Sequence, residues 1–301
     1  MEGLVLFNKP SGLTSTQIVN YFKKITKKKV GHGGTLDPLA NGLLILGIGE
    51  FTKELTKFLK ESTKTYIAEI VLGAKSNTYD KEGKIEVVSS KKVELEEIEK
   101  TLNEFLGEIE QSPPPFSAVK IKGKPAYQYA RLREKIDLKP RKVKIYEIRI
   151  INYNWPNLKL ELTVSSGAYI RSLANDLGEK LGVGAYLNGL VRTKIDEFNL
   201  DEALTFEDLK NNYLEFLAKV YGRVQGVGFR FFCYNWAKNL KIFGYAKNLN
   251  DGSVEILAQG REENLQKFLE KIKQGPKLAK IEKLEVVWRK AKNKVFNFET
   301  L

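Results

Sequence analysis

The order of hydrophobic patterns in the last third of the chain restricts the fold most strongly. From residue 219 onward, the alternation typical of strands and the spacing typical of helices follow each other as strand, helix, strand, strand, helix, strand. A short glycine loop, QGVG (225–228), joins the first strand to the first helix. The order βαββαβ is that of the ferredoxin-like split βαβ unit. We therefore expect residues 218–301 to form a domain of this kind.

Residues 1–217 mix helical and strand periods, which predicts an α+β fold for this part as well. Ser15 or Thr16 is expected to cap a helix that runs to about Ile25, and residues 93–109 have helical spacing. The apolar run LLILGIG (43–49) predicts a buried strand. Two alternating segments on either side of YNWPN predict a hairpin. The pattern changes near residue 217 without a Gly/Ser linker, so we predict two domains, 1–217 and 218–301.

The counts of two residue types exclude several kinds of site. The one cysteine, Cys233, cannot form an internal disulfide, a CxxC pair or a thiolate zinc site. The one histidine, His32, excludes metal sites built on paired histidines. We therefore expect neither a metal nor a cofactor, and any catalysis is expected to use carboxylates, Arg, Lys and Tyr.

The charge of the chain favours a polyanionic partner. The formal net charge is +13, and residues 218–301 contribute +9 of it. A lysine-rich composition that serves solubility is the simpler alternative. No run approaches the roughly 20 apolar residues that cross a bilayer, and the first apolar run is too short for a signal peptide. We expect a cytoplasmic protein with no membrane partner, and nothing in the sequence implies an oligomer.

A glycine-dense loop, GHGGTLDPLANG (31–42), holds the first candidate catalytic residue. Its glycines permit backbone conformations that a Cβ would forbid, and Pro38 biases Asp37 toward an extended conformation. Such a loop could hold a carboxylate at a fixed angle beside a bulky ligand. When the loop is considered alone, an ordinary Asx turn is the favoured explanation.

Five motifs in register resemble the TruB family of tRNA pseudouridine synthases, and the resemblance covers nearly all of residues 1–210. They are KPSGLTS (9–15), GHGGTLDPLANGLLILGIGEFTK (31–53), KTY (64–66), QSPPPFSAVKIKGKPAYQYAR (111–131) and SGAYIRSLANDLGEKLGVGAYLNGLVRT (166–193). The resemblance implies a mixed-sheet catalytic domain that converts a uridine of the tRNA T-loop, at position 55, into pseudouridine. The expected partner is thus tRNA, through its T-loop.

The resemblance also implies roles for single residues. Asp37 matches the catalytic aspartate, which attacks the ribose or the base so that uracil can detach, rotate and reattach through carbon. Arg171 matches the arginine that pairs with it, and a bidentate guanidinium would hold the carboxylate ionised and aligned. Tyr66 matches the tyrosine that packs on the target base.

Further residues match the lining of the same pocket: Lys9 and Pro10 its floor, His32 a support for the everted T-loop, and Tyr169 and Leu190 its wall. Because the target nucleotide must leave its stack before chemistry, an aromatic, an apolar wall and a charged pair should converge. Simpler roles in the core or on the surface stay open for these residues, as does a structural hydrogen bond for His32.

Three departures from the family pattern concern RNA binding more than chemistry. Residue 77 is Asn where the family usually has Asp, and RTKIDEF (192–198) lacks the Gly commonly found before the Phe. The RNA-binding PUA domain with which the family usually continues is absent, and the βαββαβ segment follows instead.

That segment carries a second candidate site. In VYGRVQGVGFRFF (220–232), a glycine loop between a strand and a helix N-terminus can offer successive backbone N–H groups to a phosphate. Residues 218–301 resemble acylphosphatase, which hydrolyses acyl phosphates without a metal. The resemblance implies a phosphate loop of Gln225, Gly226, Val227, Gly228 and Phe229, a phosphate-binding Arg230, and Asn248 as the residue that orients the attacking water.

These resemblances predict a bifunctional enzyme that acts on tRNA and on a small acyl phosphate. Two alternatives stay open. The C-terminal domain could be a non-catalytic module for docking RNA or protein in place of the PUA domain. The whole chain could also bind RNA without catalysis, although the charged pair at Asp37 and Arg171 argues against that.

Overall fold

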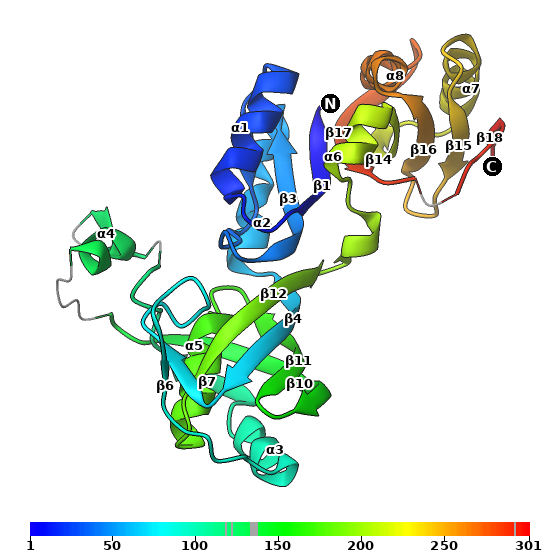
Figure 1. Cartoon of the computed structure of the whole chain (residues 1–301). Helices are drawn as coiled ribbons and strands as arrows, with labels where there is room; N and C mark the ends of the chain where they lie inside the picture. The colour runs from blue at the N-terminus through cyan, green and yellow to red at the C-terminus, as the bar shows by residue number, and fades with distance from the viewer. Residues whose placement is uncertain (118, 122, 133–137, 292) are drawn as a thin grey trace. The chain divides into compact units, whose positions relative to one another are not determined.

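A computed structural model describes residues 1–117, 119–121, 123–132, 138–291 and 293–301 (Figure 1). The chain divides into two compact units. Unit 1 comprises residues 1–36, 42–56 and 198–301, and unit 2 comprises residues 37–41 and 57–197. Both combine helices with sheets, so the predicted α+β class is confirmed. In the described part of the chain, no helix is long and apolar enough to cross a membrane.

The sheet of unit 1 brings the two ends of the chain together. Its strands follow the order β18-β15-β16-β14-β17-β1-β3, and β2 pairs with β3. The bounds are β1 (Gly3–Lys9), β2 (Val30–His32), β3 (Asn41–Ile48), β14 (Tyr213–Arg223), β15 (Phe243–Asn248), β16 (Val254–Arg261), β17 (Lys280–Arg289) and β18 (Phe298–Thr300). The helices are α1 (Ser15–Thr26), η1 (Gly49–Lys53), α2 (Leu55–Lys60, which continues into unit 2), η2 (Leu200–Glu202), α6 (Phe206–Asn211), α7 (Phe229–Asn239) and α8 (Glu262–Gln274), with the short strand β13 (Phe198–Asn199) before η2.

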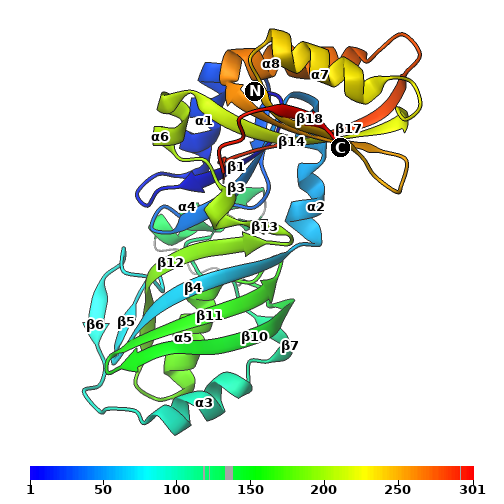
Figure 2. The same cartoon turned by 90° about the vertical axis from the view of Figure 1, so that its right-hand side faces the viewer.

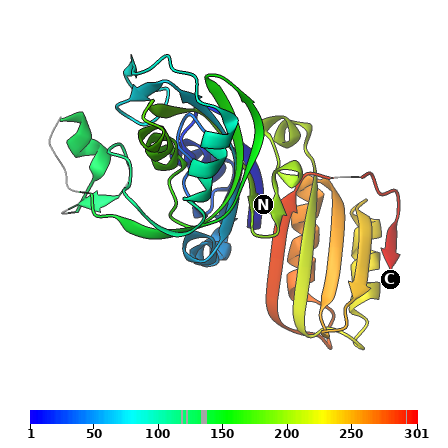
Figure 3. The same ribbon diagram turned by 90° about the horizontal axis from the view of Figure 1, so that it is seen from below.

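The predicted βαββαβ order of the C-terminal part is confirmed as β14-α7-β15-β16-α8-β17. Strand β14 pairs antiparallel with β16 and β17, and β15 pairs antiparallel with β16. Helices α7 and α8 lie on one face of this sheet (Figure 3). The short β18 adds a parallel strand beside β15. The predicted domain boundary between residues 217 and 218 falls inside β14.

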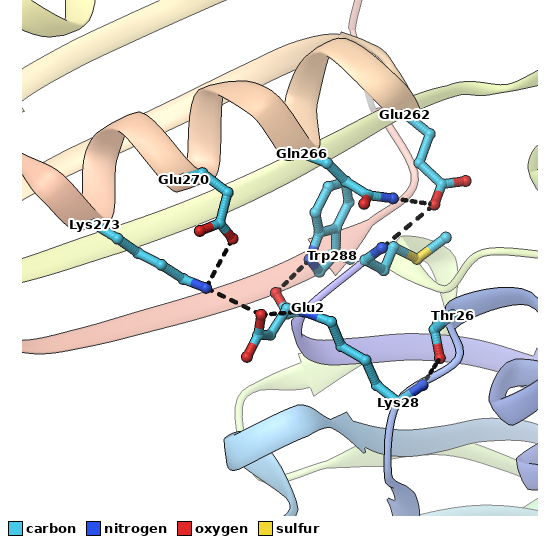
Figure 4. A network of polar contacts seen from close by, with 9 residues as sticks. Glu2, Thr26, Lys28, Glu262, Gln266, Glu270, Lys273 and Trp288 are labelled. Atoms are coloured by element: carbon cyan, nitrogen blue, oxygen red, sulfur yellow. Dashed lines mark hydrogen bonds and ion pairs between the residues drawn. The ribbon is translucent and has the colours of Figure 1, made fainter.

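Strand β17 does not end the sheet, because β1 pairs with it in parallel through Leu4↔Val287 and Val5↔Trp288. The indole of Trp288 is fully buried, and its Nε1 donates to the main-chain oxygen of Glu2 at 2.9 Å. Figure 4 shows the Glu2 carboxylate between Lys273, at 3.0 Å, and Lys28. Although burial raises it, hydrogen bonds from these two lysines hold the pKa of the Glu2 carboxyl below its ordinary value. The first residues of the chain and the βαββαβ segment thus form one body.

Unit 2 is built on the antiparallel sheet β12-β4-β11-β10-β7 (Figure 2). Burial alternates along β4, so one face of the sheet is turned toward the core. Helix α5 packs on that face. The strands are β4 (Thr63–Leu72), β7 (Gly107–Gln111), β10 (Arg141–Asn154), β11 (Asn157–Ser165) and β12 (Ala185–Ile195). Around them lie α3 (Leu95–Asn103), α4 (Ala126–Arg131), α5 (Ile170–Lys180) and two small hairpins, β5 (Ala74–Ser76) with β6 (Ile85–Val87), and β8 (Lys120–Ile121) with β9 (Lys124–Pro125).

Two local predictions were wrong in detail. Thr14, rather than Ser15 or Thr16, caps α1, because its side chain accepts the N–H of Gln17 in a capping box. The helix predicted over residues 93–109 is only α3, and strand β7 begins at Gly107. The helix already ends at Asn103, and Gly107, with a φ of +91°, turns the chain into the strand. The hairpin around YNWPN and the buried strand at LLILGIG are confirmed as β10–β11 and β3.

Candidate active sites

Arg171 is the centre of the first site, which lies in unit 2. It occupies the first turn of α5, and its side chain is only 6% exposed. Its Nε lies 2.9 Å from Oδ2 of Asp37, whose side chain is 37% exposed. This Nε–H is not directed at the oxygen in a hydrogen bond. The contact is therefore a single ion pair rather than the bidentate fork that the sequence suggested.

Three other groups hold the guanidinium. Its Nη1 lies 3.4 Å from Oδ2 of Asp80 and donates to the main-chain oxygen of Thr78 at 3.3 Å. Its Nη2 donates to the main-chain oxygen of Phe116 at 3.1 Å. A buried guanidinium requires such partners, because an unpaired charge is costly to bury. The result is a fixed positive charge beside a carboxylate that solvent and substrate can reach.

Asp80 is a site residue that the sequence reasoning missed. It is buried, and its Oδ1 accepts hydrogen bonds from the hydroxyl of Thr78 at 2.6 Å and from the N–H of Glu82 at 3.0 Å. Tyr79, immediately before it, has a φ of +65°, a conformation that few non-glycine residues adopt. The segment SNTYD ahead of the turn KEG was a visible signal. Only the folded turn, however, reveals that this aspartate faces Arg171.

We expect Asp80→Asn to lower the rate of a reaction at Asp37 about tenfold, with the KM for the substrate unchanged. The asparagine oxygen can keep the bonds from Thr78 and Glu82, but its NH₂ group would then face Nη1 of Arg171 and repel it. Single-turnover kinetics would measure the effect. Asp176→Asn, on the same helix as Arg171, is the matched control and should stay within twofold of wild type. A rate for Asp80→Asn within twofold would contradict the prediction.

Tyr66 and Leu190 lie on one face of the unit 2 sheet. Tyr66 in β4 pairs with Arg192 in β12, and Leu190 pairs with Ala68. Cross-strand partners and residues two apart share a face, so Tyr66 and Leu190 are diagonal neighbours. Both are more than 90% buried. They place an aromatic and an apolar side chain next to each other in the buried face of the sheet.

Tyr169 stands at the N-cap of α5, two residues before Arg171. Gln111, which is buried at the end of β7, accepts its N–H at 2.7 Å and donates to its main-chain oxygen at 3.0 Å. The amide thereby fixes the start of α5. Burial, assisted by the Asp37 carboxylate, raises the pKa of the Tyr169 phenol, while Arg141 and Arg171 oppose the rise. Tyr169 is thus within electrostatic reach of the ion pair.

Lys9, Pro10 and His32 belong to unit 1, so their predicted place beside Asp37 stays a prediction. The Lys9 side chain is fully buried, and its Nζ donates to the main-chain oxygens of Pro10 at 3.0 Å and Leu13 at 2.5 Å. These bonds fix the turn between β1 and α1. His32 ends β2, opposite Leu46 of β3.

The second site surrounds the N-terminus of α7. A pocket of about 240 Å³ is lined by Val224, Gln225, Gly226, Gly228, Phe229, Arg230, Phe231, Asn248 and Thr300. Gly226 and Gly228 have φ values of +71° and +77°, which only glycine adopts without strain, and Gly228 is the N-cap. The side chain of Gln225 anchors the loop by donating to the main-chain oxygens of Leu249 at 2.8 Å and Ser253 at 2.9 Å.

The pocket brings together most residues of the predicted phosphate site. Arg230 and Asn248 both line it, and Nη1 of Arg230 donates to the main-chain oxygen of Leu301. Val227 is buried and is not among the lining residues. The side chain of Phe229 is 2% exposed, so it anchors the loop to the core. A helix N-terminus, a glycine loop and an arginine in one pocket form a site suited to an oxyanion.

Comparisons with known proteins relate both parts of the chain to known families. Residues 23–170 match the family model described as TruB family pseudouridylate synthase (N terminal domain), residues 171–221 match the tRNA pseudouridylate synthase B C-terminal domain, and residues 216–300 match the acylphosphatase model. The tRNA pseudouridine synthase B of Aquifex aeolicus is 44% identical over 211 residues, which span 69% of this chain and 73% of that protein. The protein of the same name from Bacteroides fragilis is 44% identical over 67% of this chain and 91% of its own length.

Among solved structures, a Cbf5-Nop10-Gar1 complex matches with a TM-score of 0.55 and 23% identity, over 94% of this chain and 84% of that one. At this identity the likeness concerns the fold alone.

Proposed function

The chain belongs to the TruB family of pseudouridine synthases, and from this premise we propose that it converts the uridine at position 55, in the T-loop of tRNA, into pseudouridine. The observation that carries the proposal is the ion pair of Asp37 and Arg171, in which a buried arginine fixes a carboxylate that is 37% exposed. The relatives named tRNA pseudouridine synthase B support tRNA as the substrate.

The reaction needs a nucleophile and a proton acceptor but no net redox change. Asp37 attacks the nucleotide at the ribose or the base, the C1′–N1 bond breaks, and uracil rotates so that C5 bonds to C1′, while the bond to Asp37 breaks and frees the carboxylate. C5 then loses its proton and N1 gains one, which balances the isomerisation. Arg171 holds the carboxylate in place. Tyr66 and Leu190 supply the surface against which the flipped base rests.

A transcript of tRNA labelled with tritium at C5 of uridine tests the proposal, because reattachment through C5 releases that tritium. The full-length protein should release about one equivalent from an unmodified transcript, and none from a transcript with cytidine at position 55. Absence of release, or equal release from both transcripts, would refute the proposed reaction or its position.

A specific observation favours a second activity in the same chain. Arg230, the glycine loop and Asn248 line one pocket, and residues 216–300 match the acylphosphatase model. We propose that this pocket hydrolyses acyl phosphates. The phosphate would displace the main-chain oxygen of Leu301 from Arg230 and accept hydrogen bonds from the loop N–H groups. Asn248 would orient a water molecule toward phosphorus. The water oxygen bonds to phosphorus, the bond to the acyl oxygen breaks, and a carboxylate leaves.

We expect Arg230→Ala to lower benzoyl phosphate hydrolysis about 10²- to 10³-fold, because an arginine that binds the transferred group stabilises its charge. Tritium release from tRNA should not change. Arg261→Ala is the matched control, since Arg261 is exposed and pairs with Tyr213, at the other end of β14 from the loop. Failure of the wild type to hydrolyse benzoyl phosphate, with tRNA modification intact, would favour a docking role for this domain.

A further inference from the structure

A groove of about 600 Å³ lies on the C-terminal part of unit 1, apart from the phosphate pocket. Its lining residues belong to α7, to β15 and to the segment that enters β18, and Figure 1 labels these three elements. No residue lines both the groove and the phosphate pocket. Its aromatic and basic members are Tyr234, Lys238, Lys241, Phe243, Phe296 and Phe298, one carboxylate, that of Glu299, also lines it, and we call it the α7–β18 groove.

One of its aromatic rings is largely open to solvent, and those of Tyr234 and Phe243 are half-buried. The Phe296 side chain is 76% exposed, which is unusual for a residue that could have been buried in a core. The ring of Tyr234 stacks on that of Phe231, which is 65% exposed, with 6.3 Å between centroids and 17° between planes. Phe231 itself lines the phosphate pocket and not the groove, so the aromatic surfaces that the groove offers to unpaired bases are those of Tyr234 and Phe296.

Its two lysines are available for an anion. Lys238 and Lys241 are exposed, and neither forms an ion pair with any residue that the structure describes. Lysines near a helix C-terminus interact favourably with the helix dipole, which by itself accounts for Lys238.

Lys241 needs a different explanation, because its backbone favours glycine. Its φ is +51°, and the bonds from its N–H to Lys238 and from the N–H of Ile242 to Ala237 form a Schellman motif at the end of α7. Glycine occupies this position without steric cost, whereas a side chain here is strained. A charged side chain placed at a position that favours glycine suggests a use for that side chain.

We propose that the α7–β18 groove binds unpaired nucleotides of the RNA substrate, with bases on Tyr234 and Phe296 and backbone phosphates on Lys238 and Lys241. The proposal rests on the proposed function, which makes tRNA the substrate. The +9 charge of residues 218–301 favours a polyanion over an apolar peptide as the occupant. The groove would then add an RNA contact outside the catalytic unit.

The test uses Lys241→Gly and Phe296→Ala in the full-length protein, with an unmodified tRNA transcript as the probe. Each variant should weaken binding about five- to tenfold, and the lysine variant should reduce the slope of log affinity against log salt by about one. Lys241→Gly should melt at the same or a higher temperature, because it relieves the backbone. Saturating tRNA should restore the wild-type kcat, so only KM rises.

Lys277→Ala and Leu278→Ala are the matched controls, as an exposed lysine and an exposed apolar residue outside the groove. If the groove variants bind the tRNA transcript within twofold of the wild-type affinity, the proposal is wrong. A protein would then be the remaining candidate occupant of the groove. A wild type that binds tRNA but releases no tritium would refute the proposed reaction instead. The two failures are therefore distinguishable.

Discussion

Asp37→Asn is expected to abolish pseudouridine formation, with a loss on the order of 10⁴-fold or more, because the amide has nearly the shape of the carboxylate but is not a nucleophile. The side chain is 37% exposed, so the change should leave the fold intact. Arg171 would keep Asp80, Thr78 and Phe116 as partners. Tritium release from the labelled transcript measures the effect.

Two controls separate chemistry from folding and binding. The melting temperature should stay close to that of the wild type, and the Kd for the transcript should change less than twofold. If Asp37→Asn kept more than about a hundredth of the wild-type rate, Asp37 would not be the nucleophile. If the wild type itself bound tRNA and released no tritium, the chain would instead be an RNA-binding protein built on the synthase scaffold.

The success of the sequence reasoning depended on how local each signal was. The βαββαβ order was predictable because each of its elements carries its own periodicity and the loops between them are short. The proximity of Asp37 and Arg171, 134 positions apart, followed only from the resemblance, since no local pattern encodes it. Their single ion pair at 2.9 Å was beyond prediction, because Asp80 and two main-chain oxygens also compete for the guanidinium.

The role of Asp80 and the pairing of β1 with β17 could not be predicted from the sequence, for a common physical reason. The direction of Asp80 depends on Tyr79 in a left-handed conformation, which the sequence gives no reason to expect. The parallel pairing of β1 with β17 joins residues more than 280 positions apart. Contacts at such separations are set by tertiary packing, so a strand at the start of the chain gives no sign of its partner at the end.

That pairing predicts that the two halves of the chain are not independent. A fragment ending at residue 212, before β14, would leave β1 without β17 and expose an unpaired strand edge. Leu4 and Val5, which are buried in the full chain, pair with β17 and would lose that cover. We expect the fragment to be insoluble, or to lack a cooperative unfolding transition, when it is compared with the full chain by circular dichroism and urea titration.

A point variant tests the same contact without truncation. Trp288→Ala should lower the free energy of unfolding by about 3–5 kcal/mol, because it empties a fully buried site and removes the hydrogen bond to Glu2. Trp236→Ala is the matched control. The Trp236 ring is only half-buried, with Lys271 Nζ at 4.5 Å from its centroid, so its loss should cost about 1 kcal/mol.

Two outcomes would show that the halves of the chain fold separately. One is a fragment 1–212 that melts at the same temperature as the full chain, and the other is an equal loss of unfolding free energy in the two tryptophan variants. If the fragment does not fold, deletion of the C-terminal part cannot measure how much that part contributes to RNA binding. Only point variants can then measure that contribution.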